Sequence, residues 1–214
     1  MGVAASPTLP GPLLAISPGA LRGKADRDEF VRRAGAAFEA GLRALIVREP
    51  GLDERAYLAL LRRLLDGLAR FDGAWIAAHD RVHAALAAGV HGVQLGFRSL
   101  APREARALCA GRLALGFSAH AGDPEGAREG ADYLLLGPVR ATPSKAGRLE
   151  PLGFEGLAAA ARAEERPLWA IGGLRPEHAA PALAAGARGV AALSGIWNAP
   201  ARAVPAYLAA LERA

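Results

Sequence analysis

The hydrophobic positions of this chain follow two alternating spacings. Short apolar runs of strand length are each followed by a longer stretch with apolar residues at helical spacing, as Tyr57, Leu61 and Leu64 show after Asp53. Strands separated by helices are typical of a parallel sheet. The expected strands lie at 13–16, 44–48, 75–78, 92–95, 113–118, 132–136, 168–171 and in the run before 194–195, and the expected helices lie at 28–40, 53–68, 81–88, from 102 onward, 124–129, 154–163, 176–185 and 201–213.

Eight strands that alternate with eight helices predict a (β/α)₈ TIM barrel, an α/β fold, in a single domain over residues 12–214. A doubly wound open sheet is the alternative. A glycine-rich fingerprint usually follows the first strand of such a sheet, whereas Ser17-Pro-Gly stands here. Residues 1–11 lack a charged leader and a long apolar stretch, so we expect a flexible N-terminal tail.

Composition and charge narrow the choice of partners. The chain has 214 residues, 52% of them hydrophobic, and a formal net charge of +5. Its arginines are scattered along helix faces beside acidic residues, which favours small anionic ligands over nucleic acid or a membrane. The single cysteine, Cys109, cannot form an intrachain disulfide, which indicates a reducing cytoplasm. The oligomeric state, a homo-oligomer included, stays open.

Glycines follow the last two expected strands. Gly172 and Gly173 come after the seventh strand, and Ser194 and Gly195 come after the eighth. Glycine lets backbone N–H groups approach an anion closely, and barrels of this class commonly bind phosphate after strands seven and eight. These residues predict a phosphate cradle, with a tight strand-to-helix turn as the alternative interpretation.

The loop after the sixth strand, residues 137–152, is longer than a simple connection requires. It carries two hydroxyls and an ammonium group at Thr142, Ser144 and Lys145. Such groups suit an anion, so the loop is expected to act with the glycine pair as a lid over a phosphate. The alternative is a solvated loop without a ligand.

Polar side chains also end the second and fifth strands. Arg48 alternates in register with Ile46, so we expect its guanidinium at the barrel mouth as a partner for a carboxylate or phosphate, or in a salt bridge to a neighbouring acid. Ser118 and His120 share a face with Gly116 and are expected at the same mouth. His120 is a candidate general acid/base, with a structural histidine as the alternative.

One carboxylate, Asp80, follows the third strand. It could be a metal ligand or merely the cap of the next helix. A serine, Ser99, stands after the fourth strand where a second acid would be needed, so the residues alone predict no dedicated metal site.

Taken in order, four motifs resemble thiamine phosphate synthase and its sister family, the TenI-type thiazole tautomerases. Both families are (β/α)₈ barrels that bind a thiazole phosphate. The resemblance extends from about Arg48 to Ile196, and it rests on Gly137-Pro-Val-Arg-Ala-Thr-Pro-Ser-Lys145, Pro151-Leu-Gly-Phe-Glu-Gly-Leu157, Trp169-Ala-Ile-Gly-Gly173 and Gly189-Val-Ala-Ala-Leu-Ser-Gly-Ile196.

The resemblance implies roles for single residues. Those that match the family's thiazole-phosphate site are Thr142, Ser144, Gly173 and Ser194. Lys145 and Ser118 match positions where the synthase contacts the pyrophosphate of its pyrimidine substrate. Arg48 matches the arginine of the synthase's second-strand motif, and His120 matches the histidine to which the tautomerase's proton transfer is assigned.

The chain departs from the synthase pattern at several positions. The usual Gln-Leu-Arg-Glu-Lys reads Ile46-Val-Arg-Glu-Pro50, and the Asn-Asp pair reads His79-Asp80. The histidine of Val-His-Leu-Gly is Gln94, and the metal-binding aspartate beyond it is Ser99. One pyrophosphate lysine and one of two Mg²⁺ carboxylates are therefore absent, which weakens the case for a reaction that must stabilise a departing pyrophosphate.

We therefore expect a tautomerase, an isomerase that needs no metal or other cofactor. It would shift a proton so that a carboxythiazole phosphate becomes aromatic, with His120 as acid/base and Arg48 on the carboxylate. The first alternative is a divergent synthase, a transferase that couples hydroxymethylpyrimidine pyrophosphate to thiazole phosphate with Mg²⁺ on Asp80. The second is a non-catalytic ligand-binding or regulatory relative.

Overall fold

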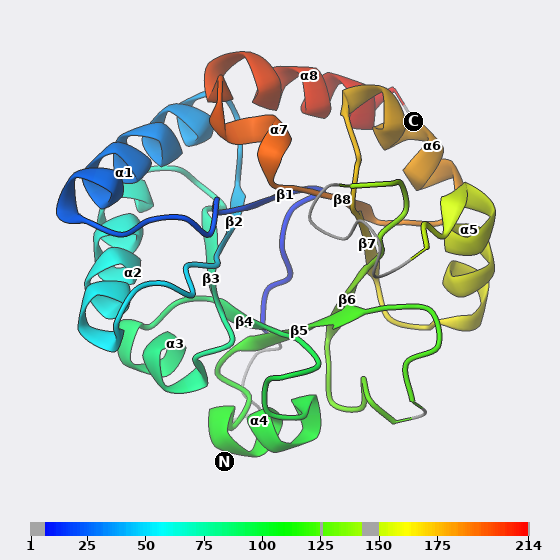
Figure 1. Ribbon diagram of the computed structural model, residues 1–214, viewed down its shortest axis with the longest axis horizontal. Coiled ribbons are helices and arrows are strands. Elements are labelled where there is room, and N and C mark those ends of the chain that lie inside the picture. The colour runs from blue at the N-terminus through cyan, green and yellow to red at the C-terminus, as the bar shows by residue number, and fades with distance from the viewer. Residues whose placement is uncertain (1–6, 125, 143–149, 214) are drawn as a thin grey trace.

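A closed barrel of eight parallel strands, paired in chain order, forms the centre of the computed structural model (Figure 1). The structure describes residues 7–124, 126–142 and 150–213. The (β/α)₈ prediction is confirmed, with β8 pairing back onto β1. The strands are β1 Leu13–Ile16, β2 Ala44–Val47, β3 Trp75–His79, β4 Gly92–Leu95, β5 Ala114–Ala119, β6 Tyr133–Leu136, β7 Leu168–Ile171 and β8 Gly189–Ala192.

Helices surround the strands, and they are placed differently from the prediction in two places (Figure 1). The helix expected at 124–129 is wrong for the described part of that stretch: residues 126–130 form turns, and Gly126 and Gly130 have φ of 80° and 87°. An additional short helix, α7, follows β8. The helices are α1 Lys24–Glu39, α2 Glu54–Leu68, α3 Val82–Ala88, α4 Pro102–Cys109, α5 Gly153–Ala163, α6 Ala179–Ala184, α7 Ser194–Trp197 and α8 Pro200–Glu212, with a 3₁₀ turn at Pro176–His178 before α6.

Large rings and glycines fill the barrel interior together. The rings of Trp75 and Trp169 both meet Tyr133 edge to face, with centroids 6.1 and 5.4 Å apart. Each ring occupies space that a neighbouring glycine leaves free: a Cβ on Gly116 would lie 2.3 Å from Tyr133 Cζ, and one on Gly189 would lie 2.7 Å from Trp169 Nε1. Inward positions therefore alternate in size between strands, and the interior is packed rather than hollow.

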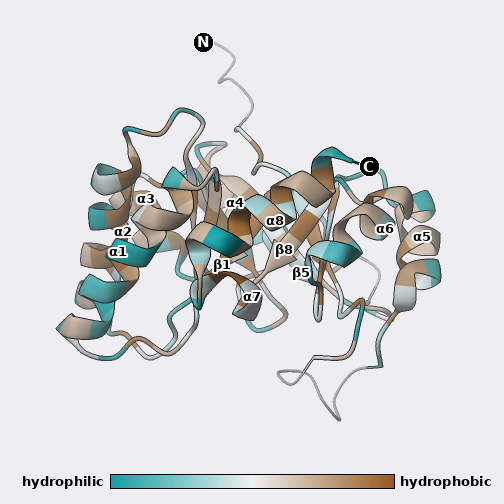
Figure 2. Cartoon of the chain, turned by 90° about the horizontal axis from the view of Figure 1, so that it is seen from above, coloured by the Kyte–Doolittle hydropathy of each residue, from teal (hydrophilic) through white to brown (hydrophobic). Residues whose placement is uncertain are grey.

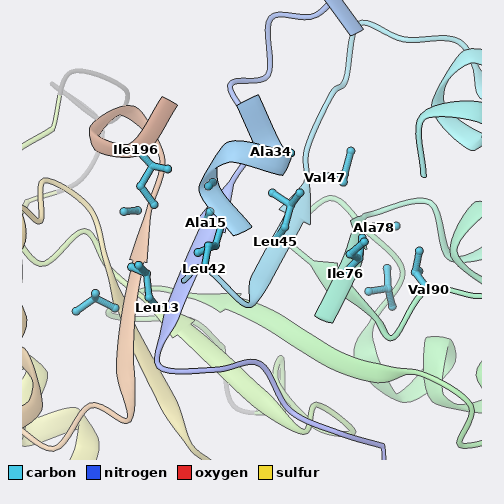
Figure 3. Close-up of a cluster of buried hydrophobic side chains, with 14 of the residues drawn as sticks. Leu13, Ala15, Ala34, Leu42, Leu45, Val47, Ile76, Ala78, Val90 and Ile196 are labelled. Carbon is cyan, nitrogen blue, oxygen red and sulfur yellow. The ribbon is translucent and has the colours of Figure 1, made fainter. Parts of the chain in front are cut away.

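The opposite faces of the strands pack against the helices. Figure 3 shows Leu13, Leu45 and Ile76 among the side chains of this layer, all of them at most 2% exposed. Polar residues lie mainly on the outer turns of the helices, and apolar ones lie along the strands (Figure 2). The period-two alternation along each strand thus separates an interior cluster from a shell cluster.

Residues 7–11, the described part of the expected tail, lie across the N-terminal end of the barrel. The indole N–H of Trp75 donates to the carbonyl of Thr8, and that of Trp169 donates to the carbonyl of Gly11, at 2.9 and 3.0 Å. Leu9 packs on the interior cluster. Strand residues at this end are therefore covered, and the opposite end forms the mouth. Across the described residues, no helix is long and apolar enough to cross a membrane.

Candidate active site

The carboxyl ends of the strands form the mouth of the barrel, where enzymes of this fold carry their active sites. Ile46 points into the interior cluster, so the alternation of β2 directs Arg48 to the mouth. By the same alternation His79 follows Ala77 on β3, and Ser118 follows Gly116 on β5. The three strand exits therefore direct a guanidinium, an imidazole and a hydroxyl toward one opening.

Arg48 is exposed and lies over the β1–α1 loop. A Cβ on Gly19 would lie 3.0 Å from Arg48 Nη1. The Arg48 guanidinium makes no hydrogen bond or ion pair within the described part of the chain, whereas its backbone N–H donates to Ser17 Oγ at 2.7 Å. The interpretation as a salt bridge to a neighbouring acid therefore finds no partner there, and the charge is available to a ligand.

The neighbouring acid, Glu49, has a different function that sequence reasoning missed. Its side chain is buried, with 2% exposure, and it accepts the backbone N–H groups of Gly19 and Leu21, each at 2.9 Å. It fixes the loop on which Arg48 lies. The only sequence signal is a carboxylate directly after a buried strand, which does not distinguish a buried acid from an exposed one.

Tyr57 joins the ends of β2 and β3. Its hydroxyl donates to the carbonyl of Val47 at 2.5 Å and accepts the N–H of His79 at 3.0 Å. Burial, and after it the positive charge of Arg48, lower the pKa of His79 to about 4, while Asp80 opposes the shift. The imidazole is therefore neutral at pH 7 beside the Arg48 guanidinium.

Asp80 is exposed at the exit of β3, and its φ of 69° is unusual for a residue other than glycine. Its N–H donates to the carbonyl of Gln94 at 2.8 Å, which fixes this backbone conformation against β4. The N-cap of α3 is Arg81, without a side-chain cap bond, so Asp80 does not act as a helix cap. No hydrogen bond or ion pair of its carboxylate occurs among the described residues.

Gln94, Ser118 and His120 continue the floor and rim of the mouth. Gln94 is 1% exposed, and its Nε2 donates to Ser118 Oγ at 3.1 Å. The N–H of His120 donates to Asp123 Oδ2 at 2.8 Å, and His120 Nδ1 lies 3.8 Å from Asp123 Oδ1. Asp123 thus orients the histidine from the loop after β5.

The glycine pair after β7 contacts the beginning of the loop after β6. The N–H groups of Val139 and Arg140 donate to the carbonyls of Ile171 and Gly172, at 2.9 and 3.0 Å. A Cβ on Gly173 would lie 2.4 Å from the carbonyl oxygen of Ala141, and both glycines have positive φ, 99° and 64°. Thr142 follows at once, half-buried, whereas Ser144 and Lys145 lie outside the described residues.

Ser194 and Gly195 are exposed and begin α7 after β8. Tyr207 of α8 lies behind them: its hydroxyl donates to the carbonyl of Leu174 at 2.8 Å, and a Cβ on Gly195 would lie 2.8 Å from that hydroxyl. One side chain therefore contacts both the exit of β7 and the exit of β8. The structure brings the two halves of the predicted cradle together.

Fold and site together define a (β/α)₈ barrel with polar and charged side chains at the carboxyl ends of its strands. The chain belongs to the thiamine monophosphate synthase family, whose model matches residues 14–196. It is 38% identical over 173 residues to the thiamine-phosphate synthase of Moorella thermoacetica, with 80% of each chain covered. It is also 38% identical over 173 residues to that of Laribacter hongkongensis, with 80% of this chain and 82% of the relative covered.

A solved structure has the same fold at lower identity. The thiamine phosphate pyrophosphorylase from Pyrococcus furiosus superposes with a TM-score of 0.81 and 27% identity, over 94% of this chain and 95% of that chain.

These comparisons contradict the expected tautomerase. Relatives at 36–38% identity over 80% or more of this chain are named thiamine-phosphate synthases, which are transferases, so the isomerase prediction is wrong. The prediction relied on two replaced residues, the lysine that is Pro50 here and the aspartate that is Ser99. The similarity to the synthase family, however, extends over residues 14–196. The tautomerase proton transfer assigned to His120 goes with that prediction, whereas a general acid/base role for His120 stays a prediction.

The neutral state of His79 predicts a pH dependence of stability. Because its pKa is lowered on folding from near 6.5 to about 4, the unfolded chain takes up a proton first as the pH falls. The free energy of unfolding is therefore unaffected by the protonation of His79 above about pH 6.5. Between pH 6.5 and 4 it falls as the pH falls, by up to about 1.4 kcal/mol per pH unit. His79→Asn should flatten this decline in urea unfolding.

The matched control for that experiment is His83→Asn, which removes an exposed imidazole from α3. An equal flattening in both variants, or none in His79→Asn, would contradict the assignment to His79.

The bonds of Glu49 predict a stability effect far from any ligand. Glu49→Ala leaves two backbone N–H groups without their acceptor and should lower the free energy of unfolding by about 2 kcal/mol. Glu39→Ala, at an exposed position paired with Arg70, should lower it by less than about 0.5 kcal/mol. Urea unfolding followed by circular dichroism measures both, and equal losses would rule out a special role for Glu49.

Proposed function

We propose that this chain is a thiamine-phosphate synthase that couples hydroxymethylpyrimidine pyrophosphate to thiazole phosphate and releases pyrophosphate. The observation that carries the proposal is a pair of uncommitted charges at adjacent strand exits. The Arg48 guanidinium and the Asp80 carboxylate have no ion-pair partner among the described residues, although the chain pairs many of its other charges. Because the chain belongs to the thiamine monophosphate synthase family, we interpret these two charges as groups that act in the synthase reaction.

The thiazole phosphate is assigned to the cradle at β7 and β8. Gly173 and Ser194 are exposed there, and positive φ at both glycines turns the backbone in a way that other residues rarely adopt. The N–H groups at the start of α7 and the Ser194 hydroxyl are donors for phosphate oxygens. Thr142 and, in the resemblance, Ser144 add hydroxyls from the β6 loop.

The pyrophosphate is assigned to the opposite side of the mouth, with Arg48 and Ser118 as donors and Lys145 as a further cation by resemblance. As the pyrimidine–oxygen bond breaks, negative charge grows on the departing pyrophosphate. Fixed donors already aimed at it stabilise that charge without reorganisation. Because His79 is neutral, Arg48 supplies the positive charge on this side of the mouth, offset in part by Asp80, and that charge suits an anionic leaving group.

The synthase family implies Mg²⁺, and the donor groups of this chain fit it only in part. Asp80 supplies one free carboxylate. Ser99 Oγ, at the next strand exit, accepts the N–H of Gly96 at 2.9 Å, and no cluster of three histidine, cysteine or acidic residues occurs in the described part of the chain. Mg²⁺ is often bound by one or two carboxylates together with substrate phosphates and water, so Asp80 would hold it with the pyrophosphate. The ion would supply charge neutralisation for the leaving group.

The direct test is formation of thiamine phosphate and pyrophosphate from the two substrates with Mg²⁺. Asp80→Asn should lower kcat by about 100-fold or more, because it removes a charge from the leaving-group side. Asparagine tolerates a positive φ as well as aspartate does, so the melting temperature should stay unchanged. No product from the wild-type chain, at any Mg²⁺ concentration, would refute the proposed function.

The serine at the exit of β4 gives a second prediction. Ser99→Asp restores a second carboxylate that can still accept the N–H of Gly96, so the Mg²⁺ concentration for half-maximal activity should fall by about tenfold. Ser99→Asn has the same shape without the charge and should leave that concentration near the wild-type value. If the two variants behave alike, the exit of β4 takes no part in metal binding.

A further inference from the structure

Two buried polar atoms under the mouth lack partners in the described part of the chain: Gln94 Oε1 and the hydroxyl of Tyr133. Both side chains are enclosed, with exposures of 1% and 0%. They point to one place, because a Cβ on Gly116 would lie 2.2 Å from Gln94 Oε1 and 2.5 Å from the Tyr133 hydroxyl. Glycine at 116 is what leaves room for both groups.

The two atoms are chemically complementary. An amide oxygen only accepts hydrogen bonds, and a phenol can donate one. Burial raises the pKa of Tyr133, and the negative charge of Asp132 raises it further, so the phenol keeps its proton. Buried polar groups without a hydrogen bond are rare, and a bond from Tyr133 to Gln94 Oε1 would satisfy both.

The same amide has a second bond that reaches the mouth. Gln94 Nε2 donates to Ser118 Oγ at 3.1 Å, and an amide nitrogen cannot accept a proton in return. The hydroxyl proton of Ser118 is therefore not used by Gln94. Since Gln94 lies beneath a half-buried Ser118, that proton is available to an acceptor in the mouth.

We propose that Tyr133 and Gln94 are positioning residues that hold Ser118 as a hydrogen-bond donor to an anionic substrate group. This inference rests on the proposed function, in which that group is the pyrophosphate. By donating its hydroxyl proton to Gln94 Oε1, Tyr133 would fix which end of the Gln94 amide faces Ser118, and Gln94 in turn would fix the direction of the Ser118 proton. With the amide reversed, its oxygen would accept that proton and the donor to the anion would be lost.

The experiment measures binding of inorganic pyrophosphate with Mg²⁺ by calorimetry to the wild-type chain, Tyr133→Phe, Ser118→Ala and the double variant. Phenylalanine keeps the ring that packs between Trp75 and Trp169 and removes only the hydroxyl. Tyr133→Phe should weaken pyrophosphate binding by about 3- to 10-fold, because Ser118 no longer presents its proton reliably. In the Ser118→Ala background the same change should have no effect, since nothing remains to be positioned.

Two further measurements separate positioning from general damage. Gln94→Met has a similar length without polar atoms and should weaken pyrophosphate binding at least as much as Tyr133→Phe. Thiazole phosphate, which is assigned to the cradle at β7 and β8, should bind all variants with the wild-type affinity. Equal weakening for both ligands would overturn the inference, because it would indicate a structural role alone.

The inference is also overturned if Tyr133→Phe leaves pyrophosphate affinity within twofold of wild type, or weakens it equally with and without Ser118. In either case the proposed function stands as long as the wild-type chain binds pyrophosphate and forms product. If the wild-type chain neither binds pyrophosphate nor forms thiamine phosphate, the proposed function fails, and the inference is overturned with it.

Discussion

The packing of aromatic rings against glycines inside the barrel is the constraint on which the rest of the structure depends. Trp75, Tyr133 and Trp169 are too large to share the interior with ordinary side chains on every neighbouring strand. Gly92, Gly116 and Gly189 give way to them, with a hypothetical Cβ 2.3–2.8 Å from the nearest ring atom. This match closes the barrel at a fixed diameter and places small or polar side chains just above the rings. The floor of the mouth is therefore determined by the core.

Above that floor, several polar side chains connect one strand exit to the next. Ser17, Glu49 and Tyr57 join the exits of the first three strands, and Tyr207 bonds to the exit of β7 and packs closely on Gly195 at the exit of β8. Arg48 and Asp80, whose charges have no ion-pair partner among the described residues, are flanked by these connections. A site of this kind binds ligands with little reorganisation, because the supporting loops are already fixed.

The placement of side chains at the barrel mouth follows in large part from the period-two alternation of the strands. Ile46 inside the barrel predicts Arg48 at the mouth, and Gly116 inside predicts Ser118 there. The buried carboxylate of Glu49 and the free one of Asp80 could not be told apart from sequence, because each simply follows a strand. Their difference arises from contacts with the β1–α1 loop and from a left-handed backbone at Asp80.

The helix expected at 124–129 is absent from the described part of that stretch for a local reason, since Gly126 and Gly130 have positive φ and interrupt a helical backbone. The predicted reaction was wrong because one replaced residue, such as Ser99 in place of an acid, is weaker evidence about the reaction than similarity along residues 14–196.

Hydrogen bonds at the closed end of the barrel connect strands from opposite sides of the ring. Thr8 is tied to Trp75 on β3, and Gly11 is tied to Trp169 on β7, two strands that stand four places apart in a ring of eight. A segment of four residues therefore links side chains that come from opposite strands of the ring. The exit of β3 carries Asp80, and the exit of β7 carries the glycine pair. The N-terminal segment contacts neither exit, yet it links the two strands that carry the proposed pyrophosphate and thiazole-phosphate sides of the mouth.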